Sequence, residues 1–155
     1  MAYASMVTGM GFGNAGTHIP HANSCAVAGS VRRYRAEGYP QMPMVPHGQA
    51  VASTAMAAFR FTFPSDPARH LRAAELIGGR PADPGEGAGA LPRVIRDLQR
   101  DIEMPNGIGA FGYTESGIGT LVAGTVQQSR QLSVAPRRLT AAAAHDTFMA
   151  SMKNW

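Results

Sequence analysis

Three histidines gather early in this chain, at a spacing that could build a metal site. His18, His21 and His47 are three of its five histidines. Neutral imidazole is a common ligand for divalent transition metals. Because His18 and His21 are three residues apart, a helix would place both on one face. His47 joins them only if the chain doubles back, which the intervening glycines and prolines allow. By spacing alone, a metal site and ordinary surface or core histidines both remain open.

The sequence motif around these histidines is more specific than their spacing. The segment from Phe12 reads Phe-Gly-Asn-Ala-Gly-x-His-x-x-His, and Pro46-His47-Gly48 opens a later helix. This pattern resembles the iron-containing alcohol dehydrogenase family, and more closely its hydroxyacid–oxoacid transhydrogenase branch. The likeness continues through Ala58–Thr62, Arg69–Leu71, Ala74–Leu76, Gly112-Tyr113, Gln128, Arg130 and Ala150–Met152. It falls on the C-terminal helical domain of that family. The N-terminal nucleotide-binding half has no counterpart in these 155 residues.

The resemblance implies a metal-dependent hydride transfer. Family members bind iron or zinc with an aspartate and three histidines, and His21 and His47 match two of those histidines. The aspartate and the first histidine belong to a part of the pattern that would precede Met1. Phe12 would lie against the substrate, and Cys25 would line the active site. The redox chemistry belongs to NAD. We therefore expect this chain alone to hold metal weakly or not at all, and not to bind NAD.

Some positions depart from the family pattern. Cys25 stands where histidine or tyrosine is usual, and Ala22 and Ala26 stand where glycine and proline are common. These departures leave the substrate open. We interpret Cys25 as a small buried residue rather than a reactive thiol. Phe12 is either a substrate contact or plain core.

The histidines also have ordinary interpretations. His21 and His47 could be helix-start residues without a ligand. We interpret His18 as structural. His70 and His145 have no evident partners in the sequence, which predicts that both lie at the surface.

Length and composition indicate a single globular domain over residues 1–155. The hydrophobic fraction is 45% and the charged fraction 15%, which argues against disorder. No apolar run approaches the length of a membrane span, and residues 1–6 do not read as a secretory signal. The single cysteine suits a reducing compartment. We therefore expect a cytoplasmic protein without a membrane partner.

The net charge of +4 does not by itself indicate a nucleic-acid partner. All of the basic residues except Lys153 are arginines, and they are spread along the chain. No aromatic residues interleave with them as a stacking platform for single strands would require. A solvated helical surface explains this pattern better, so nucleic acid is an unfavoured partner.

Helical periodicity predicts an all-α, bundle-like fold of about six or seven helices. The expected helices are centred on residues 3–10, 20–25, 48–63, 67–77, 91–102, 118–122 and 144–152. Pro20 suits the first turn of the second of these helices, and Ser65-Asp66-Pro67 indicates the start of the fourth. Residues 29–46 read as a long connection and residues 81–89 as a glycine-rich loop. We expect the stripe Leu91, Val94, Ile95, Leu98 and Ile102 to pack in the core. Thr114 or Ser116 would cap the helix that follows.

Two functions remain open on the sequence. The first is the metal-binding half of an alcohol dehydrogenase or transhydrogenase, inactive alone, whose partner is a nucleotide-binding half or a separate subunit. The second is a non-catalytic helical module that binds a protein partner or nucleic acid. For the first, we expect an exposed apolar patch near Met6, Phe12 and His21, or self-association that hides it. An upstream reading frame with a nucleotide-binding segment would discriminate between them.

Overall fold

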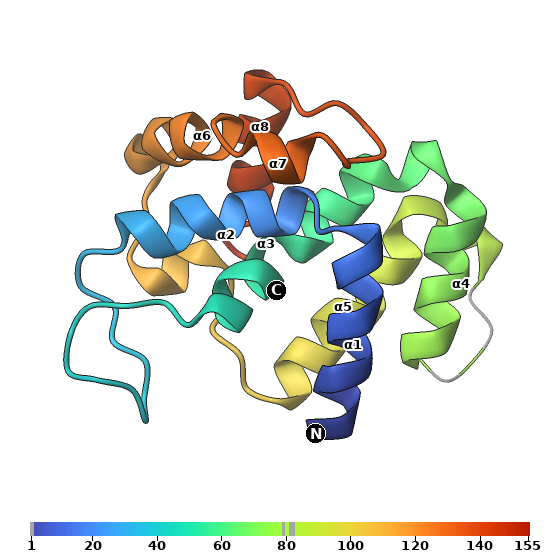
Figure 1. Cartoon of the computed structure of the whole chain (residues 1–155), viewed down its shortest axis with the longest axis horizontal. Helices are drawn as coiled ribbons and strands as arrows, with labels where there is room; N and C mark the ends of the chain where they lie inside the picture. Colours follow the sequence, from blue (N-terminus) through green and yellow to red (C-terminus); the bar gives the residue numbers. More distant parts are fainter. Residues whose placement is uncertain (1, 79, 81–82) are drawn as a thin grey trace.

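A computed structural model describes residues 2–78, 80 and 83–155 of the chain. These residues form eight α-helices and no β-strand, so the predicted all-α class is confirmed (Figure 1). The helices are α1 (Ala2–Ala15), α2 (Ile19–Ser30), α3 (His47–Thr62), α4 (Pro67–Gly78), α5 (Ala90–Asp101), α6 (Ile118–Val126), α7 (Ser129–Leu132) and α8 (Ala141–Ala150). The expected number of six or seven is therefore low. The helix without a predicted counterpart is α7, a single turn too short to show periodicity.

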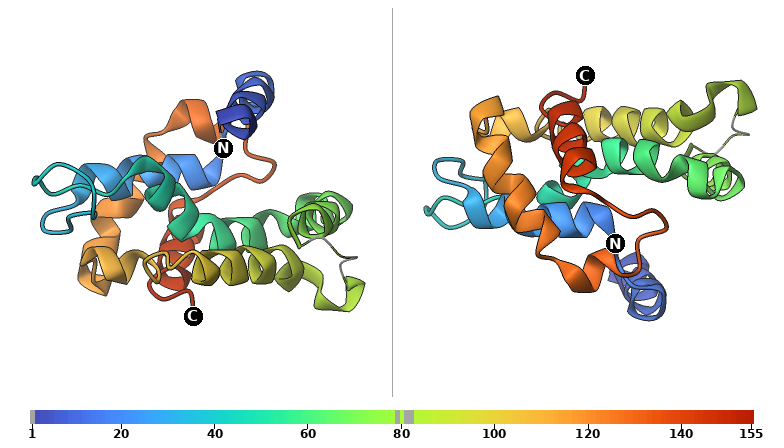
Figure 2. Two further views of the ribbon diagram at one scale, coloured as in Figure 1. Left: turned by 90° about the horizontal axis from the view of Figure 1, so that it is seen from below. Right: turned by 90° about the horizontal axis from the view of Figure 1, so that it is seen from above.

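The main core lies where α2, α3, α6 and α8 meet (Figures 1 and 2). Phe148 of α8 and Ile118 and Leu121 of α6 are fully buried there. Val27 of α2 and Ile108 of the turn before α6 belong to the same cluster. Helix α2 packs against both α3 and α6, so its first turn is fixed from two sides.

A smaller core joins α4 to α5. Ala74, Leu91 and Val94 are buried there, with Ile95 partly buried beside them. The last two residues of the expected stripe are not buried, because Leu98 and Ile102 are 49% and 61% exposed. The prediction that the whole stripe packs in the core is therefore wrong, since α4 covers only the first turns of α5.

Local signals for helix starts were reliable where a proline or an aspartate supplied them. Pro20 lies in the first turn of α2, as predicted. The Asp66 carboxylate accepts a hydrogen bond of 3.0 Å from the Arg69 N–H at the start of α4. The expected cap of α6 is not formed. The Thr114 and Ser116 hydroxyls bond each other at 3.0 Å, and α6 follows a 3-10 turn over Glu115–Gly117.

The long connection between α2 and α3 doubles back, as predicted. It leaves α2 after Ser30 and returns to His47, and the Met44 N–H donates to the Tyr34 carbonyl across it at 2.9 Å. The glycine-rich loop was assigned wrongly in part, because Pro84–Gly89 form 3-10 turns on either side of a kink at Gly87. Residues 81 and 82 of that loop lie outside the described residues.

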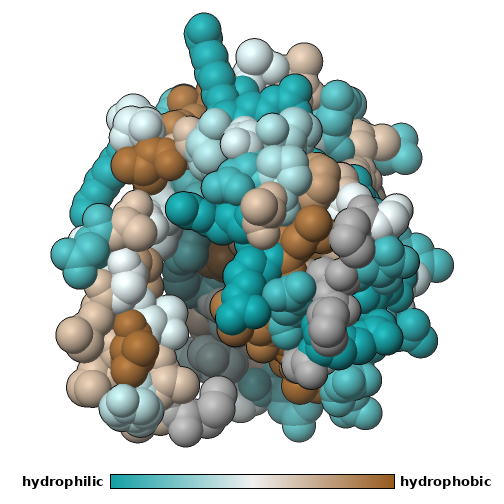
Figure 3. All heavy atoms as spheres, turned by 90° about the vertical axis from the view of Figure 1, so that its right-hand side faces the viewer, coloured by the Kyte–Doolittle hydropathy of each residue, from teal (hydrophilic) through white to brown (hydrophobic). Residues whose placement is uncertain are grey.

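Helix α1 stands apart from the rest of the fold. None of its residues from 2 to 15 is buried, and it carries no charged side chain. Figure 3 shows a hollow beside it, and Figure 2 shows it projecting from the body. Tyr3, Met6 and Met10 are 77%, 58% and 66% exposed. The expected exposed apolar patch is therefore present on this helix.

Candidate functional site

The fold brings His21 and His47 together from two different helices. His21 lies in the first turn of α2, and His47 is the first residue of α3. Their ring centroids are 5.3 Å apart, and the ring planes are inclined by 58°. The connection that doubles back between α2 and α3 produces this approach. Two imidazoles at this separation are compatible with two ligands of one ion.

Both rings line a cavity of about 480 Å³ that opens at the end of α1. Phe12 lines the same cavity and is 51% exposed, so the interpretation of Phe12 as plain core is wrong. The other lining residues are Gly13, Gly16, Thr17, Arg130, Gln131, Ser133 and Val134. Residues in and after α7 thus line the same cavity as the residues of the histidine motif.

Arg130 is the cavity residue whose chemistry was not anticipated. It lies in α7 and brings a permanent positive charge to the cavity that holds the histidines. Its position in the sequence, far beyond His47, gives no sign of this neighbourhood. The match of Gln128 and Arg130 to the family pattern was the one available signal, and it did not assign a role.

The electrostatic surroundings favour neutral imidazoles. Burial lowers the pKa of His21 from its usual value, and the nearby His47 lowers it further. Burial also lowers the pKa of His18, with smaller contributions from His21 and His70. A neutral ring offers a free nitrogen lone pair, which is the form that binds a metal ion.

Among the described residues, His21 and His47 form a pair rather than part of a larger cluster of potential metal ligands. Within the described parts of the chain, no group of three histidine, cysteine, aspartate or glutamate side chains is placed to hold a metal ion. His21 and His47 are a pair, which is fewer than the four ligands that zinc usually takes. Their role as metal ligands stays a prediction.

Cys25 lies on the solvent-exposed face of α2. It is exposed, so our interpretation of it as a small buried residue is wrong. It follows His21 by one helical turn, which places both on the same side of α2. It does not line the cavity that contains Phe12, and its place in a substrate site stays a prediction.

The remaining histidines divide into packed and exposed ones. His18 is partly buried and meets Phe59 edge-on, with ring centroids 6.0 Å apart, which supports a structural role. His70 was wrongly assigned to the surface without partners. Its Nδ1 lies 2.8 Å from the Asp66 carbonyl oxygen, and its Nε2 lies 3.0 Å from the Thr62 hydroxyl. These partners come from the junction of α3 and α4.

His145 is exposed on α8, as the sequence predicted. Its Nδ1 lies 3.6 Å from a carboxylate oxygen of the adjacent Asp146. It lines none of the cavity that holds His21 and His47. His145 is therefore a suitable control position for tests of the histidine pair.

Comparison with known proteins agrees with the fold and the motif. Residues 1–152 match the model of the Fe-containing alcohol dehydrogenase family, C-terminal. The chain belongs to the iron-containing alcohol dehydrogenase family and carries its C-terminal domain. The resemblance drawn from the histidine motif is thereby confirmed.

Similar proteins point to one branch of this family. The chain is 41% identical over 156 residues to the mitochondrial hydroxyacid-oxoacid transhydrogenase of Xenopus tropicalis, covering 99% of this chain and 34% of that protein. A probable mitochondrial hydroxyacid-oxoacid transhydrogenase of Dictyostelium discoideum is 38% identical over 156 residues, covering 98% and 28%. The chain thus spans 34% and 28% of the lengths of these relatives.

A solved structure shares the fold. The crystal structure of 1,3-propanediol oxidoreductase has a TM-score of 0.78 at 23% sequence identity, covering 97% of this chain and 36% of that one. At that identity the likeness concerns the fold alone. Within the described residues, no helix is long and apolar enough to cross a membrane. The cytoplasmic location stays a prediction, and the relatives above are named as mitochondrial.

Proposed function

We propose that this chain is the metal-binding C-terminal half of a hydroxyacid–oxoacid transhydrogenase or iron-dependent alcohol dehydrogenase. The observation that carries the proposal is the approach of His21 and His47 on one cavity, with ring centroids 5.3 Å apart. Family membership and the similarity to the transhydrogenases support it. The reaction would be hydride transfer from a hydroxy acid or alcohol, linked to NAD.

The two histidines have a defined task in such a reaction. The two rings would supply two of the ligands to iron or zinc, and burial favours the neutral, metal-binding form of His21 by lowering its pKa. When bound, the metal would polarise the substrate oxygen as a Lewis acid. The rings come from the starts of α2 and α3, two packed helices, so their separation is fixed before any ligand arrives.

The rest of the cavity suits a small hydroxy acid. Arg130 would pair with the substrate carboxylate, since a guanidinium binds carboxylates with two parallel hydrogen bonds. Phe12 supplies an apolar wall against the hydrocarbon part of the substrate and limits access of water from that side. An alcohol without a carboxylate would use the histidines and Phe12 but not Arg130.

We further propose that turnover requires a nucleotide-binding half, in the same polypeptide or as a separate subunit. The chain spans 34% of the length of its Xenopus tropicalis relative. Helix α1 carries exposed apolar side chains beside the hollow seen in Figure 3, which a second half would cover. Because positioning of cofactor and substrate supplies much of the rate, we expect no NAD-linked oxidation by these 155 residues alone.

A chimera tests this proposal. The part of the Xenopus tropicalis transhydrogenase that this chain does not match would be joined to residues 1–155. With iron or zinc present, we expect the chimera to oxidise 4-hydroxybutyrate to succinate semialdehyde while it reduces 2-oxoglutarate to 2-hydroxyglutarate. We expect no turnover by the chain alone. Turnover is followed by product analysis. Metal-dependent turnover by the isolated chain would contradict the need for a second half.

Variants of the chimera test the site itself. His47→Ala should lower turnover by more than about 100-fold, since even a lost outer-shell partner of a metal ligand costs about 10- to 100-fold. His145→Ala is the matched control, because it removes an exposed imidazole that does not line the cavity. Equal activity of both variants would rule out a catalytic role for His47.

A further inference from the structure

A second cavity lies on another side of the helical core. It has a volume of about 580 Å³ and is bounded by α3, the start of α5 and the segment that follows α8. It shares no lining residue with the cavity that contains His21 and His47. Nothing in the proposed hydride transfer uses it.

Positive charge dominates the walls of this second cavity. Arg60 of α3, Arg93 and Arg96 of α5 and Lys153 near the C-terminus all line it. The single carboxylate among the lining residues is Glu86. Four cationic side chains around one small cavity repel each other unless anions compensate them.

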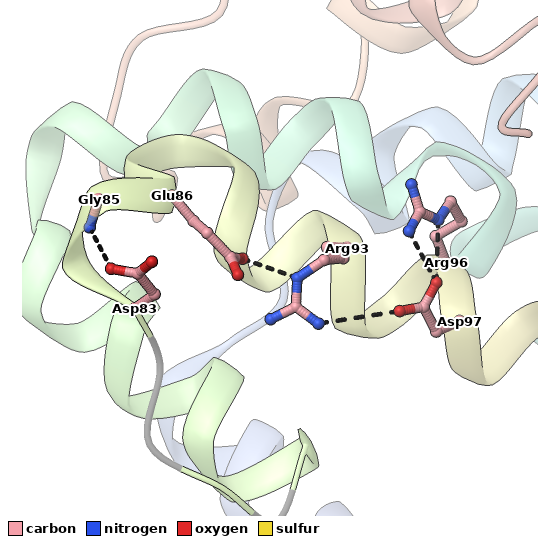
Figure 4. A network of polar contacts seen from close by, with 6 residues as sticks. All are labelled: Asp83, Gly85, Glu86, Arg93, Arg96 and Asp97. Carbon is pink, nitrogen blue, oxygen red and sulfur yellow. Dashed lines mark hydrogen bonds and ion pairs between the residues drawn. The ribbon is translucent and has the colours of Figure 1, made fainter.

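Two of these cations are held in place by carboxylates, as Figure 4 shows. The Arg93 Nε donates to Glu86 at 2.7 Å, and its Nη1 lies 3.8 Å from Asp97. The Arg96 Nη2 donates to Asp97 at 2.8 Å. Each guanidinium keeps further N–H groups that these bonds do not use. The carboxylates therefore hold the two guanidinium groups in place and leave some of their N–H groups available to a ligand.

The other two cations have no such compensation. Within the described parts of the chain, neither Arg60 nor Lys153 forms an ion pair. With Glu86 and Asp97 balancing the two arginines of α5, the charge left at the cavity is that of Arg60 and Lys153. The cavity thus carries an excess of about two positive charges.

The surrounding structure holds these groups around the cavity. The Asp83 carboxylate accepts the Gly85 N–H at 2.8 Å, which starts the 3-10 turn that carries Glu86 (Figure 4). The segment after α8 is anchored by Asn154, whose side chain donates to the Ser53 carbonyl of α3 at 3.0 Å. Lys153 is therefore kept beside α3 rather than left on a free chain end.

The base of the cavity is apolar. Met56 and Ala57 of α3 are 6% and 8% exposed, and Pro92 of α5 is buried. A charged rim over an apolar base suits a ligand with a charged group and a short hydrocarbon part. Water alone would form few hydrogen bonds with such an apolar base.

We propose that this cavity binds a small dianion through phosphate or carboxylate oxygens, at a site separate from the histidine pair. The oxyanion is held by Arg60 and Lys153 together with the free N–H groups of Arg93 and Arg96. Any hydrocarbon part of the ligand lies against Met56 and Pro92. Such a site would let a metabolite act on the protein without entering the cavity of the proposed reaction.

Titration of the whole chain with two probes tests this site. Inorganic phosphate and glutarate are added separately, against chloride at matched ionic strength, and binding is followed by arginine and lysine side-chain NMR signals. We expect at least one probe to saturate in the millimolar range and to shift the signals of Arg93 and Arg96. Phosphate alone or glutarate alone would each support the site and identify its ligand class.

Variants decide whether the cavity is responsible. Arg60→Gln and Lys153→Gln should each weaken the probe by about tenfold, which is the factor that one charge-assisted hydrogen bond supplies. Arg100→Gln is the matched control, because it removes an exposed arginine from α5 that does not line the cavity. Equal binding by all three variants, or no saturable binding of either probe, would overturn the proposal.

Discussion

Tyr113 joins the connection before α6 to the main core. It is partly buried, and its hydroxyl donates a hydrogen bond to the Val27 carbonyl oxygen near the end of α2. Burial raises the pKa of Tyr113 to about 12, and the positive charge of Arg32 offsets only part of that effect. The protonated phenol is therefore the form that the folded state holds.

This shift predicts a loss of stability in alkali. Because the pKa of Tyr113 is raised in the folded state, its stabilising effect is complete below the ordinary value of 10.0. It is lost as the pH rises toward about 12, since the unfolded chain ionises first. Compared with Tyr113→Phe, the native chain should be more stable by about 1 kcal/mol at neutral pH, and this advantage should shrink in alkali.

Urea unfolding of both proteins across this range measures the effect. The pKa of Tyr34 is also raised, but that residue is common to both proteins and cancels in the difference. A constant difference between the two proteins at all pH values would show that the Tyr113 phenol is not protected by burial.

At the level of single residues, the sequence predicted the residue pair that belongs to a family motif. It did not predict contacts that depend on how helices pack. The family motif indicated His21 and His47, and the doubled-back connection brings their rings together. It did not indicate the partners of His70, because Thr62 and the Asp66 carbonyl meet it only where α3 turns into α4. The exposure of Cys25 depends in the same way on which face of α2 packs against its neighbours.

Among the elements, the turn before α6 depends on glycines pressed against the end of the chain. The Gly109 N–H donates to the Met152 carbonyl oxygen at 3.1 Å, and a Cβ at Gly109 would lie 2.7 Å from that oxygen. Gly119, exposed in α6, has nothing within 4 Å of a Cβ built on it. The two glycines thus differ in packing.

Alanine at these positions should have opposite effects. Gly109→Ala should lower the free energy of unfolding by about 1–3 kcal/mol, because the chain end must move away. Gly119→Ala should raise it by up to about 1 kcal/mol through helix propensity. Denaturant unfolding of both variants measures these changes. An unchanged stability in Gly109→Ala would show that the segment after α8 does not pack against this turn.

Helix boundaries were predictable where the sequence contains a capping residue or a proline at the helix start. Pro20 and Asp66 marked the starts of α2 and α4 correctly. The single turn of α7 and the 3-10 helix Pro84–Gly89 have too few residues for a periodic pattern. The exposure of Leu98 could not be foreseen, since periodicity shows that α5 has an apolar face but not how far a neighbour covers it.

For the whole molecule, α1 is the helix whose exposed apolar side chains most clearly indicate a missing packing partner. Its residues contact solvent, and the helix contains Gly9, Gly11 and Gly13, which disfavour an isolated helix. Without its proposed second half, the chain should therefore cover α1 by self-association. We expect the sedimentation coefficient to rise with concentration. Met10→Lys should suppress this rise and Leu98→Lys should not, although both replace exposed apolar residues. A native chain that stays monomeric throughout would contradict this account.

The metal content of the chimera tests the central claim, that His21 and His47 bind one metal ion together. After dialysis against metal-free buffer, the chimera should retain about one equivalent of iron or zinc. His21→Ala and His47→Ala should each retain less than about a tenth of that amount, because each removes one ligand from the same ion. His145→Ala should retain all of it. Full retention of metal by either His21→Ala or His47→Ala would contradict the shared site.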